Sequence, residues 1–191
     1  MIINQFEKSI QIKIVYYGSA MSGKTTSLKH LMGYYGKADE LQSIETSTGR
    51  TLVFDHGSLL FPGENWNLKI SLLSATGQDF YLSTRPSTLK MVDGLIFVID
   101  SQKKYLEDNL RSWNELFLFF GENIHKLPII LCLNKQDLPD LIDPEYLNHF
   151  LNISRFNKVE IIKTVAVKGE GVVNSFNEIV KLIFPSIVLA A

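Results

Sequence analysis

The sequence predicts a single α/β domain over residues 1–191, in which three layers place a mostly parallel six-stranded sheet between flanking helices. Strand-like and helix-like segments alternate along the chain, which is typical of parallel strands joined by helices. The run Ile129–Leu133 is continuously apolar, as expected for a parallel strand buried on both faces. Polar and glycine-containing motifs follow several predicted strands, at the edge of the sheet where such folds bind ligands. The length is sufficient for one core, and no linker-like stretch divides the chain.

Periodicity and composition place the individual elements in order. The two longest helical segments after the first hundred residues carry apolar residues at helical spacing, so each is expected to bury one face against the sheet. The strands are expected near residues 10–17, 51–55, 66–74, 94–100, 128–133 and 159–165. The helices are expected near residues 24–36, 104–120, 143–150 and 172–184.

The segment after the first strand, Gly18–Thr25, reads G-x-x-x-x-G-K-T, which is the P-loop pattern. Its strand–loop–helix context suits phosphate binding, because glycines let the backbone approach the oxygens and the helix N-terminus supplies positive potential. Lys24 is expected to contact the outer phosphates, and Thr25 is expected to offer its hydroxyl to Mg²⁺. The predicted phosphate-binding residues are Gly18, Ser19, Ala20, Met21, Ser22, Gly23, Lys24, Thr25 and Thr26.

The tetrapeptide Asn134–Asp137 reads N-K-x-D and directly follows the apolar strand. The Asp137 carboxylate is expected to be buried and to accept hydrogen bonds from the N1 and N2 donors of guanine. Adenine lacks this pair of donors, and sites built on such hydrogen bonds discriminate strongly. The Lys135 stem is expected to pack on the base, and Asn134 to tie this loop to the P-loop. The two motifs together predict GTP and GDP as ligands.

A third motif, Ser74–Gln78, follows the strand expected at 66–74 and ends in T-G-Q. This ending resembles the D-x-x-G-Q switch of small GTPases, in which the glycine faces the terminal phosphate and the glutamine positions the attacking water. Gly77 and Gln78 match these positions, with a solvated loop glutamine as the alternative for Gln78. Ser74 stands where an aspartate normally holds Mg²⁺ through water, so that contact is expected to be weaker or replaced.

Taken together, these motifs resemble the Ras superfamily of small GTPases, and most closely its prokaryotic gliding-motility branch, the MglA-type GTPases. The resemblance extends from about Ile10 to Phe184, and that branch also lacks the aspartate on the Mg²⁺ side. It implies a P-loop NTPase with the Ras-like fold. The segments most similar to that branch are 12–18, 22–26, 50–55 and 92–98.

The resemblance also assigns roles to residues of the first switch. Thr51 matches the threonine that contacts Mg²⁺ and the terminal phosphate, while Thr46 and Thr48 stay open as alternatives for that role. Arg50 matches an arginine that can swing toward the phosphates and stabilise the transition-state charge in cis. The alternative for Arg50 is a surface arginine that precedes a strand.

The resemblance further aligns 165–167 with the S-A-K loop of the superfamily, where only the central alanine matches. Ala166 and Val167 are therefore expected to present the backbone to the guanine carbonyl. The catalytic residues implied are Lys24, Arg50 and Gln78, and the residues that hold Mg²⁺ are Thr25 and Thr51.

The function predicted from these residues is a GTP-hydrolysing molecular switch. Hydrolysis is expected to be slow without a partner, because Ala20 replaces a P-loop glycine and its methyl lies near the terminal phosphate. A second hypothesis is an interaction module that stays GTP-bound with little hydrolysis, which Ala20 and Ser74 favour and which Arg50 and Gln78 oppose. A third hypothesis is a P-loop kinase. The N-K-x-D motif opposes it, and no arginine-rich lid is evident in the sequence.

The composition restricts the classes of partner that the protein is expected to bind. The formal net charge is -1 without a basic stripe, which argues against nucleic acid as the main partner. Cys132 lies in an apolar strand and is expected to be a small core residue, and the histidines show no metal spacing. No membrane span, signal peptide or lipidation motif is expected, and the apolar tail 184–189 is expected to pack on the domain.

These observations predict a cytoplasmic protein that is a monomer when alone, with no direct membrane anchor. Any recruitment to a membrane or cell pole would therefore depend on partners. The resemblance implies a roadblock- or longin-type protein as GTPase activator or effector.

Overall fold

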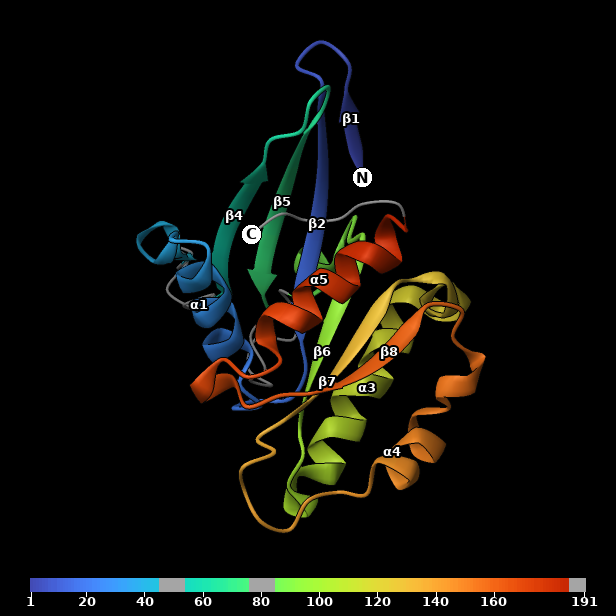
Figure 1. The fold of residues 1–191 in the computed structure, drawn as a ribbon. Coiled ribbons are helices and arrows are strands. Elements are labelled where there is room, and N and C mark those ends of the chain that lie inside the picture. Colours follow the sequence, from blue (N-terminus) through green and yellow to red (C-terminus); the bar gives the residue numbers. More distant parts are fainter. Residues whose placement is uncertain (45–53, 76–84, 186–191) are drawn as a thin grey trace, which may run out of the picture.

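A computed structural model describes residues 1–44, 54–75 and 85–185, which form one sheet covered by helices on both faces (Figure 1). Helices α1 (Lys24–Tyr34) and α5 (Val172–Ile183) cover one face. Helices α3 (Leu106–Phe120) and α4 (Pro144–Leu151), with the short α2 (Arg85–Leu89), pack on the other. This arrangement confirms the predicted three-layer α/β fold with a mostly parallel sheet.

The strands form an eight-stranded sheet in the order β3-β4-β5-β2-β6-β7-β8, with β1 beside β2. The neighbours from β5 through β2, β6 and β7 to β8 are parallel, whereas β1, β3 and β4 pair antiparallel. The strands are β1 (Ile2–Asn4), β2 (Ser9–Tyr17), β3 (Gln42–Ile44), β4 (Phe54–Phe61), β5 (Asn67–Ser74), β6 (Gly94–Asp100), β7 (Ile129–Asn134) and β8 (Val159–Lys163).

Among the described residues, the sheet has two strands more than the predicted six. Strands β1 and β3 have three residues each, too few for an alternating pattern to be visible in the sequence. The strand expected at 51–55 extends to Phe61, where the residues from Asp55 onward pair antiparallel with β5. Residues 51–53 lie outside the described residues. Helix α2 was not predicted, since five residues carry no helical period.

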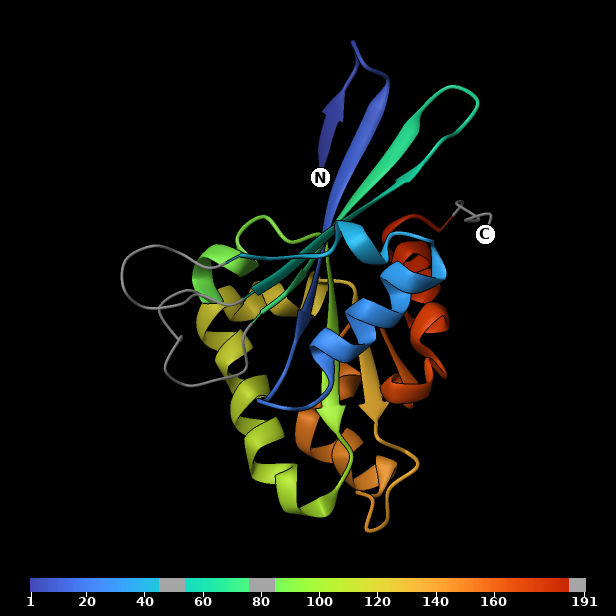
Figure 2. The same cartoon turned by 90° about the vertical axis from the view of Figure 1, so that its left-hand side faces the viewer.

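Two hairpins extend the sheet well beyond the helices, as Figure 2 shows. One joins β1 to β2 and the other joins β4 to β5, and they lie side by side because β2 and β5 pair along their length. The parallel strands β2, β6 and β7 end at the opposite side of the domain (Figure 1). Ligand sites of open parallel sheets form at that carboxyl edge.

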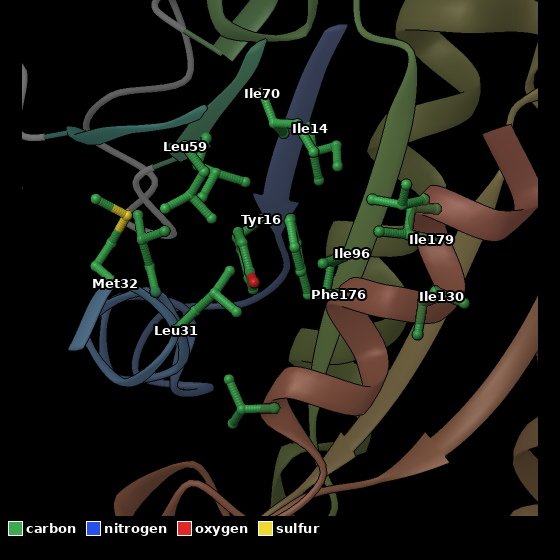
Figure 3. Close-up of a cluster of buried hydrophobic side chains, with 14 of the residues drawn as sticks. Ile14, Tyr16, Leu31, Met32, Leu59, Ile70, Ile96, Ile130, Phe176 and Ile179 are labelled. Atoms are coloured by element: carbon green, nitrogen blue, oxygen red, sulfur yellow. The ribbon is translucent and has the colours of Figure 1, made fainter. Parts of the chain in front are cut away.

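The core between the sheet and helices α1 and α5 is built from large side chains (Figure 3). Tyr16 and Ile14 of β2 face Leu31 of α1 and Phe176 of α5, and all four are fully buried. Burial of each apolar side chain among them, Ile14, Leu31 and Phe176, stabilises the fold by roughly 1.5–3 kcal/mol relative to leaving it exposed. Phe184 packs against the same core, whereas residues 186–189 of the predicted tail lie outside the described residues.

The second core fills the opposite face of the sheet. Trp113 of α3 packs edge-on against Phe97 of β6, with ring centroids 5.1 Å apart, and also contacts Phe156. On the first face, Cys132 of β7 is buried, and burial raises the pKa of its thiol to about 12. The thiol therefore stays protonated and unreactive at neutral pH, which confirms that Cys132 is a core residue.

In the described ranges 1–44, 54–75 and 85–185, no helix combines the length and the apolar character that crossing a membrane requires.

Candidate functional site

The P-loop joins the end of β2 to the start of α1, as the sequence predicted. The Lys24 ammonium group is buried and donates to the carbonyl oxygens of Gly18, at 2.9 Å, and Ser19, at 2.5 Å. The Lys24 side chain thus folds back over the P-loop, and its ammonium charge lies beside the carbonyl groups of Gly18 and Ser19. Such a loop concentrates positive potential where a phosphate chain binds. Ala20 and Met21 of this loop are exposed.

Asn134 connects the P-loop to the segment 164–166. Its amide nitrogen donates to the Ser22 carbonyl at 2.7 Å, and its amide oxygen accepts from the Ala166 N–H at 2.9 Å and the Thr164 hydroxyl at 3.2 Å. The approach requires a glycine at position 23, because a Cβ built there would lie 2.1 Å from the Asn134 amide nitrogen. The predicted tie between the N-K-x-D loop and the P-loop is therefore present as a direct hydrogen bond.

A cavity of about 260 Å³ lies between these loops. It is concave and mostly apolar with a few polar groups, which is the usual character of a small-molecule site. Most of the residues predicted to face the base line it. The lining consists of Met21, Gly23, Thr26, Asn134, Lys135, Asp137, Leu138, Val165, Ala166 and Val167.

Asp137 is exposed at the wall of this cavity, so the prediction of a buried carboxylate is wrong for this structure. The loop that carries it leaves the sheet edge after Asn134, and the cavity beside it is open to solvent. A ligand base that fills the cavity would itself cover the carboxylate. The recognition chemistry predicted for Asp137 then depends on the ligand to exclude water.

The residue that sequence reasoning missed is Asp55 of β4. Its carboxylate is 5% exposed and accepts a hydrogen bond of 2.7 Å from the Thr25 hydroxyl. Asp55 is the direct cross-strand partner of Ser74, the position at which a carboxylate was expected and not found. The carboxylate is thus supplied by the neighbouring strand instead of by β5. The only sequence signal was an acidic residue inside a strand-like segment, and its register was not predictable.

A magnesium ion fits the donor set at this point. Mg²⁺ prefers oxygen ligands and is usually held by one or two protein groups together with phosphates. The Thr25 hydroxyl and the Asp55 carboxylate provide such oxygens directly beside the P-loop. We therefore assign Thr25 and Asp55 as the described residues that suit the ion.

Several predicted site residues cannot be compared with the structure. Arg50, Thr51, Gly77 and Gln78 lie outside the described residues, as do the alternative threonines Thr46 and Thr48. Their catalytic and metal-binding roles stay predictions.

The sequence is similar to those of known proteins over most of its length. A model of the ADP-ribosylation factor family matches residues 1–183. The mutual gliding-motility protein MglA of Myxococcus xanthus is 35% identical over 95% of this chain and 94% of that protein. ADP-ribosylation factor-like protein 5 of Dictyostelium discoideum is 29% identical over 88% of this chain and 85% of that protein. The human Ras-related protein Rab-4B is 28% identical over 86% of this chain and 72% of that protein.

The family model spans nearly the whole chain and includes β2, the P-loop segment and α1. The family model and the similarity to MglA confirm the resemblance to MglA-type proteins that the motifs indicated. The chain belongs to the ADP-ribosylation factor family of Ras-like small GTPases.

Proposed function

We propose that this GTP-binding protein is a molecular switch that holds GTP or GDP with Mg²⁺ and hydrolyses GTP slowly until a partner stimulates it. The observation that carries the proposal is the hydrogen-bonded junction at Asn134, which brings the P-loop and the base loops around one cavity. The basic test is a competition titration with GTP, GDP and ATP. Tight binding of ATP would contradict guanine selectivity.

The chain's own residues would act mainly by positioning. Lys24 would neutralise charge on the outer phosphates, while Gln78 would orient the attacking water and Arg50 would stabilise charge that develops in the transition state. Thr25 and Asp55 would hold Mg²⁺, which when bound neutralises charge on the phosphate oxygens. Water would attack the terminal phosphorus as the bond to the leaving diphosphate oxygen breaks.

The Asp55 carboxylate is expected to control the affinity for Mg²⁺. Asp55→Asn should raise the Mg²⁺ concentration needed to slow GDP release by about 10- to 100-fold, as is typical for groups that orient metal ligands. Release of a fluorescent GDP derivative, followed across a Mg²⁺ titration, measures this shift.

Ser74→Ala is the matched control and should leave the Mg²⁺ titration close to wild type. Because Asp55 and Ser74 face each other across two strands, the exchange of Asp55→Ser with Ser74→Asp should restore part of the Mg²⁺ dependence. An unchanged titration in Asp55→Asn would show that this carboxylate has no part in holding the ion.

Hydrolysis is expected to depend on Arg50 and Gln78. Arg50→Ala and Gln78→Leu should each slow single-turnover GTP hydrolysis by about 10²-fold or more, since each removes a group that acts on the transition state. GDP affinity should change little, and the double variant should be less than additive.

Arg111→Ala, which changes an exposed arginine on α3, is the control and should hydrolyse GTP at the wild-type rate. The assay should be run alone and with a candidate activator of the roadblock or longin type. A wild-type rate for Arg50→Ala under both conditions would make Arg50 a surface residue.

A GTP-bound interaction module with little hydrolysis is the second candidate function. Ala20 supports it, because its methyl group lies on the P-loop in place of a glycine. The same single-turnover assay separates the two functions, since a module of this kind would retain GTP with every partner tested. Under either function, we propose a cytoplasmic protein that partners recruit to a membrane or pole.

A further inference from the structure

We propose that Asn109 and Asp100 are positioning residues that hold the P-loop and the base-contacting Lys135 as one unit, and thereby slow nucleotide release. The proposal rests on guanine-nucleotide binding as proposed above. It concerns a buried chain of polar side chains that runs from the P-loop across α3 and β6 to the N-K-x-D loop.

The first half of this chain is made by Asn109 of α3, which is 1% exposed. Its amide oxygen accepts from the Ser19 hydroxyl at 3.1 Å and from the Asp100 N–H at 3.2 Å. Its amide nitrogen donates to the Asp100 carbonyl at 2.8 Å. One side chain thus clamps the P-loop to the end of β6. The Ser19 carbonyl, on the same residue, is one of the two that accept from Lys24.

The second half is made by the Asp100 carboxylate, which is also 1% exposed. One oxygen accepts from the Gln102 N–H at 3.1 Å, and the other accepts from the Lys135 ammonium at 2.5 Å. The Lys135 ammonium also lies 5.5 Å from the centre of the Tyr105 ring. A buried carboxylate with a charged partner fixes that partner in place, because a charge left unpaired in the interior is costly. Asp100 therefore determines where the Lys135 stem lies.

The position of Lys135 matters because its stem borders the cavity. Lys135 itself has a left-handed backbone, with φ of 66°, so local preference does not favour its conformation. Long-range contacts must then hold it. Because Asn109 holds both Ser19 and Asp100, displacement of the phosphate loop would be transmitted to the base loop and vice versa. The two halves of the nucleotide site are expected to open together rather than separately.

The test is a double-mutant cycle on the release rate of a fluorescent GDP derivative, with wild type, Asp100→Asn, Lys135→Ala and the double variant. Asp100→Asn keeps an acceptor for Gln102 but removes the charge, and should speed release about tenfold, as expected for loss of a hydrogen bond between charged groups. In the Lys135→Ala background the same change should have no effect on release. Residues that act independently would instead be additive.

Thermal unfolding of the same four proteins separates positioning from simple stabilisation. Lys135→Ala leaves the Asp100 carboxylate buried without its partner, so adding Asp100→Asn to that variant should raise Tm while release stays unchanged. If Asp100→Asn speeds release equally in both backgrounds, the Asp100–Lys135 link has no positioning role and the proposal fails. If wild type itself does not bind GDP, the proposed function fails first.

The Asn109 half is tested by Asn109→Leu and, because that variant can disturb folding, by the milder Ser19→Ala. Each should speed GDP release several-fold, and together they should be less than additive because they break the same hydrogen bond. Ser112→Ala is the control. Ser112 is also buried on α3, and among the described residues it has no hydrogen bond to the P-loop or β6. If Ser19→Ala releases GDP at the wild-type rate, the proposed link between Asn109 and the P-loop is wrong.

Discussion

Asp137→Asn is expected to weaken GDP binding by about 10²-fold or more and to shift preference toward xanthosine diphosphate. The substitution is expected to disrupt two hydrogen bonds from guanine to a charged carboxylate, and each such bond contributes about 1.5–3 kcal/mol. An asparagine amide offers one donor and one acceptor, which matches the C2 carbonyl and the N1–H of xanthine. Competition titrations with both diphosphates measure the shift.

Asp140→Asn is the matched control for this change. Asp140 lies in the same exposed loop with φ of 57°, a conformation that asparagine and aspartate both tolerate. Its backbone carbonyl accepts from the Lys103 N–H, a contact that the substitution preserves. GDP binding should therefore stay at the wild-type level. Because Asp137 is exposed, its variant should also keep the wild-type Tm, and an unchanged preference for GDP would contradict the assignment.

Gly23→Ala is expected to abolish measurable nucleotide binding and to lower stability by roughly 2–5 kcal/mol. Gly23 has φ of 108°, and an added Cβ would meet the Asn134 amide 2.1 Å away. The clash must displace Asn134, which then loses its hydrogen bonds to the Ser22 carbonyl and the Ala166 N–H. Calorimetry of GDP binding and of thermal unfolding measures both effects.

Gly33→Ala is the control, because Gly33 lies in α1, the helix that directly follows Gly23, and a Cβ there meets nothing within 4 Å. Removing a glycine from a helix is expected to stabilise the fold by about 0.5–1 kcal/mol, with nucleotide binding unchanged. GDP binding by Gly23→Ala at the wild-type level would show that the Asn134 junction is not needed for the site.

The parts of the site that consist of consecutive residues could be predicted from the sequence. The binding residues of the P-loop and of the N-K-x-D motif are consecutive or nearly so. The type of each residue and the preceding strand are therefore sufficient to predict both motifs. Gly23 and Asn134 show what the motifs do not predict, which is the contact between them. Both were predicted as site residues. Their close packing, which would leave a Cβ at position 23 only 2.1 Å from the Asn134 amide nitrogen, is visible only in three dimensions.

The carboxylate that lies beside Thr25 could not be predicted from the sequence, because strand register selects it. Asp55 faces Ser74 because β4 runs antiparallel to β5 in one particular register, and a shift of one residue would turn Asp55 to the other face of the sheet. Asn109 reaches Ser19 across 90 positions of sequence for a similar reason. A lone polar residue on a helix face carries no pattern of its own, and its partner is set by how α3 packs on the sheet. Motifs made of neighbouring residues are thus readable from the sequence, whereas contacts that depend on register and packing are decided by the fold.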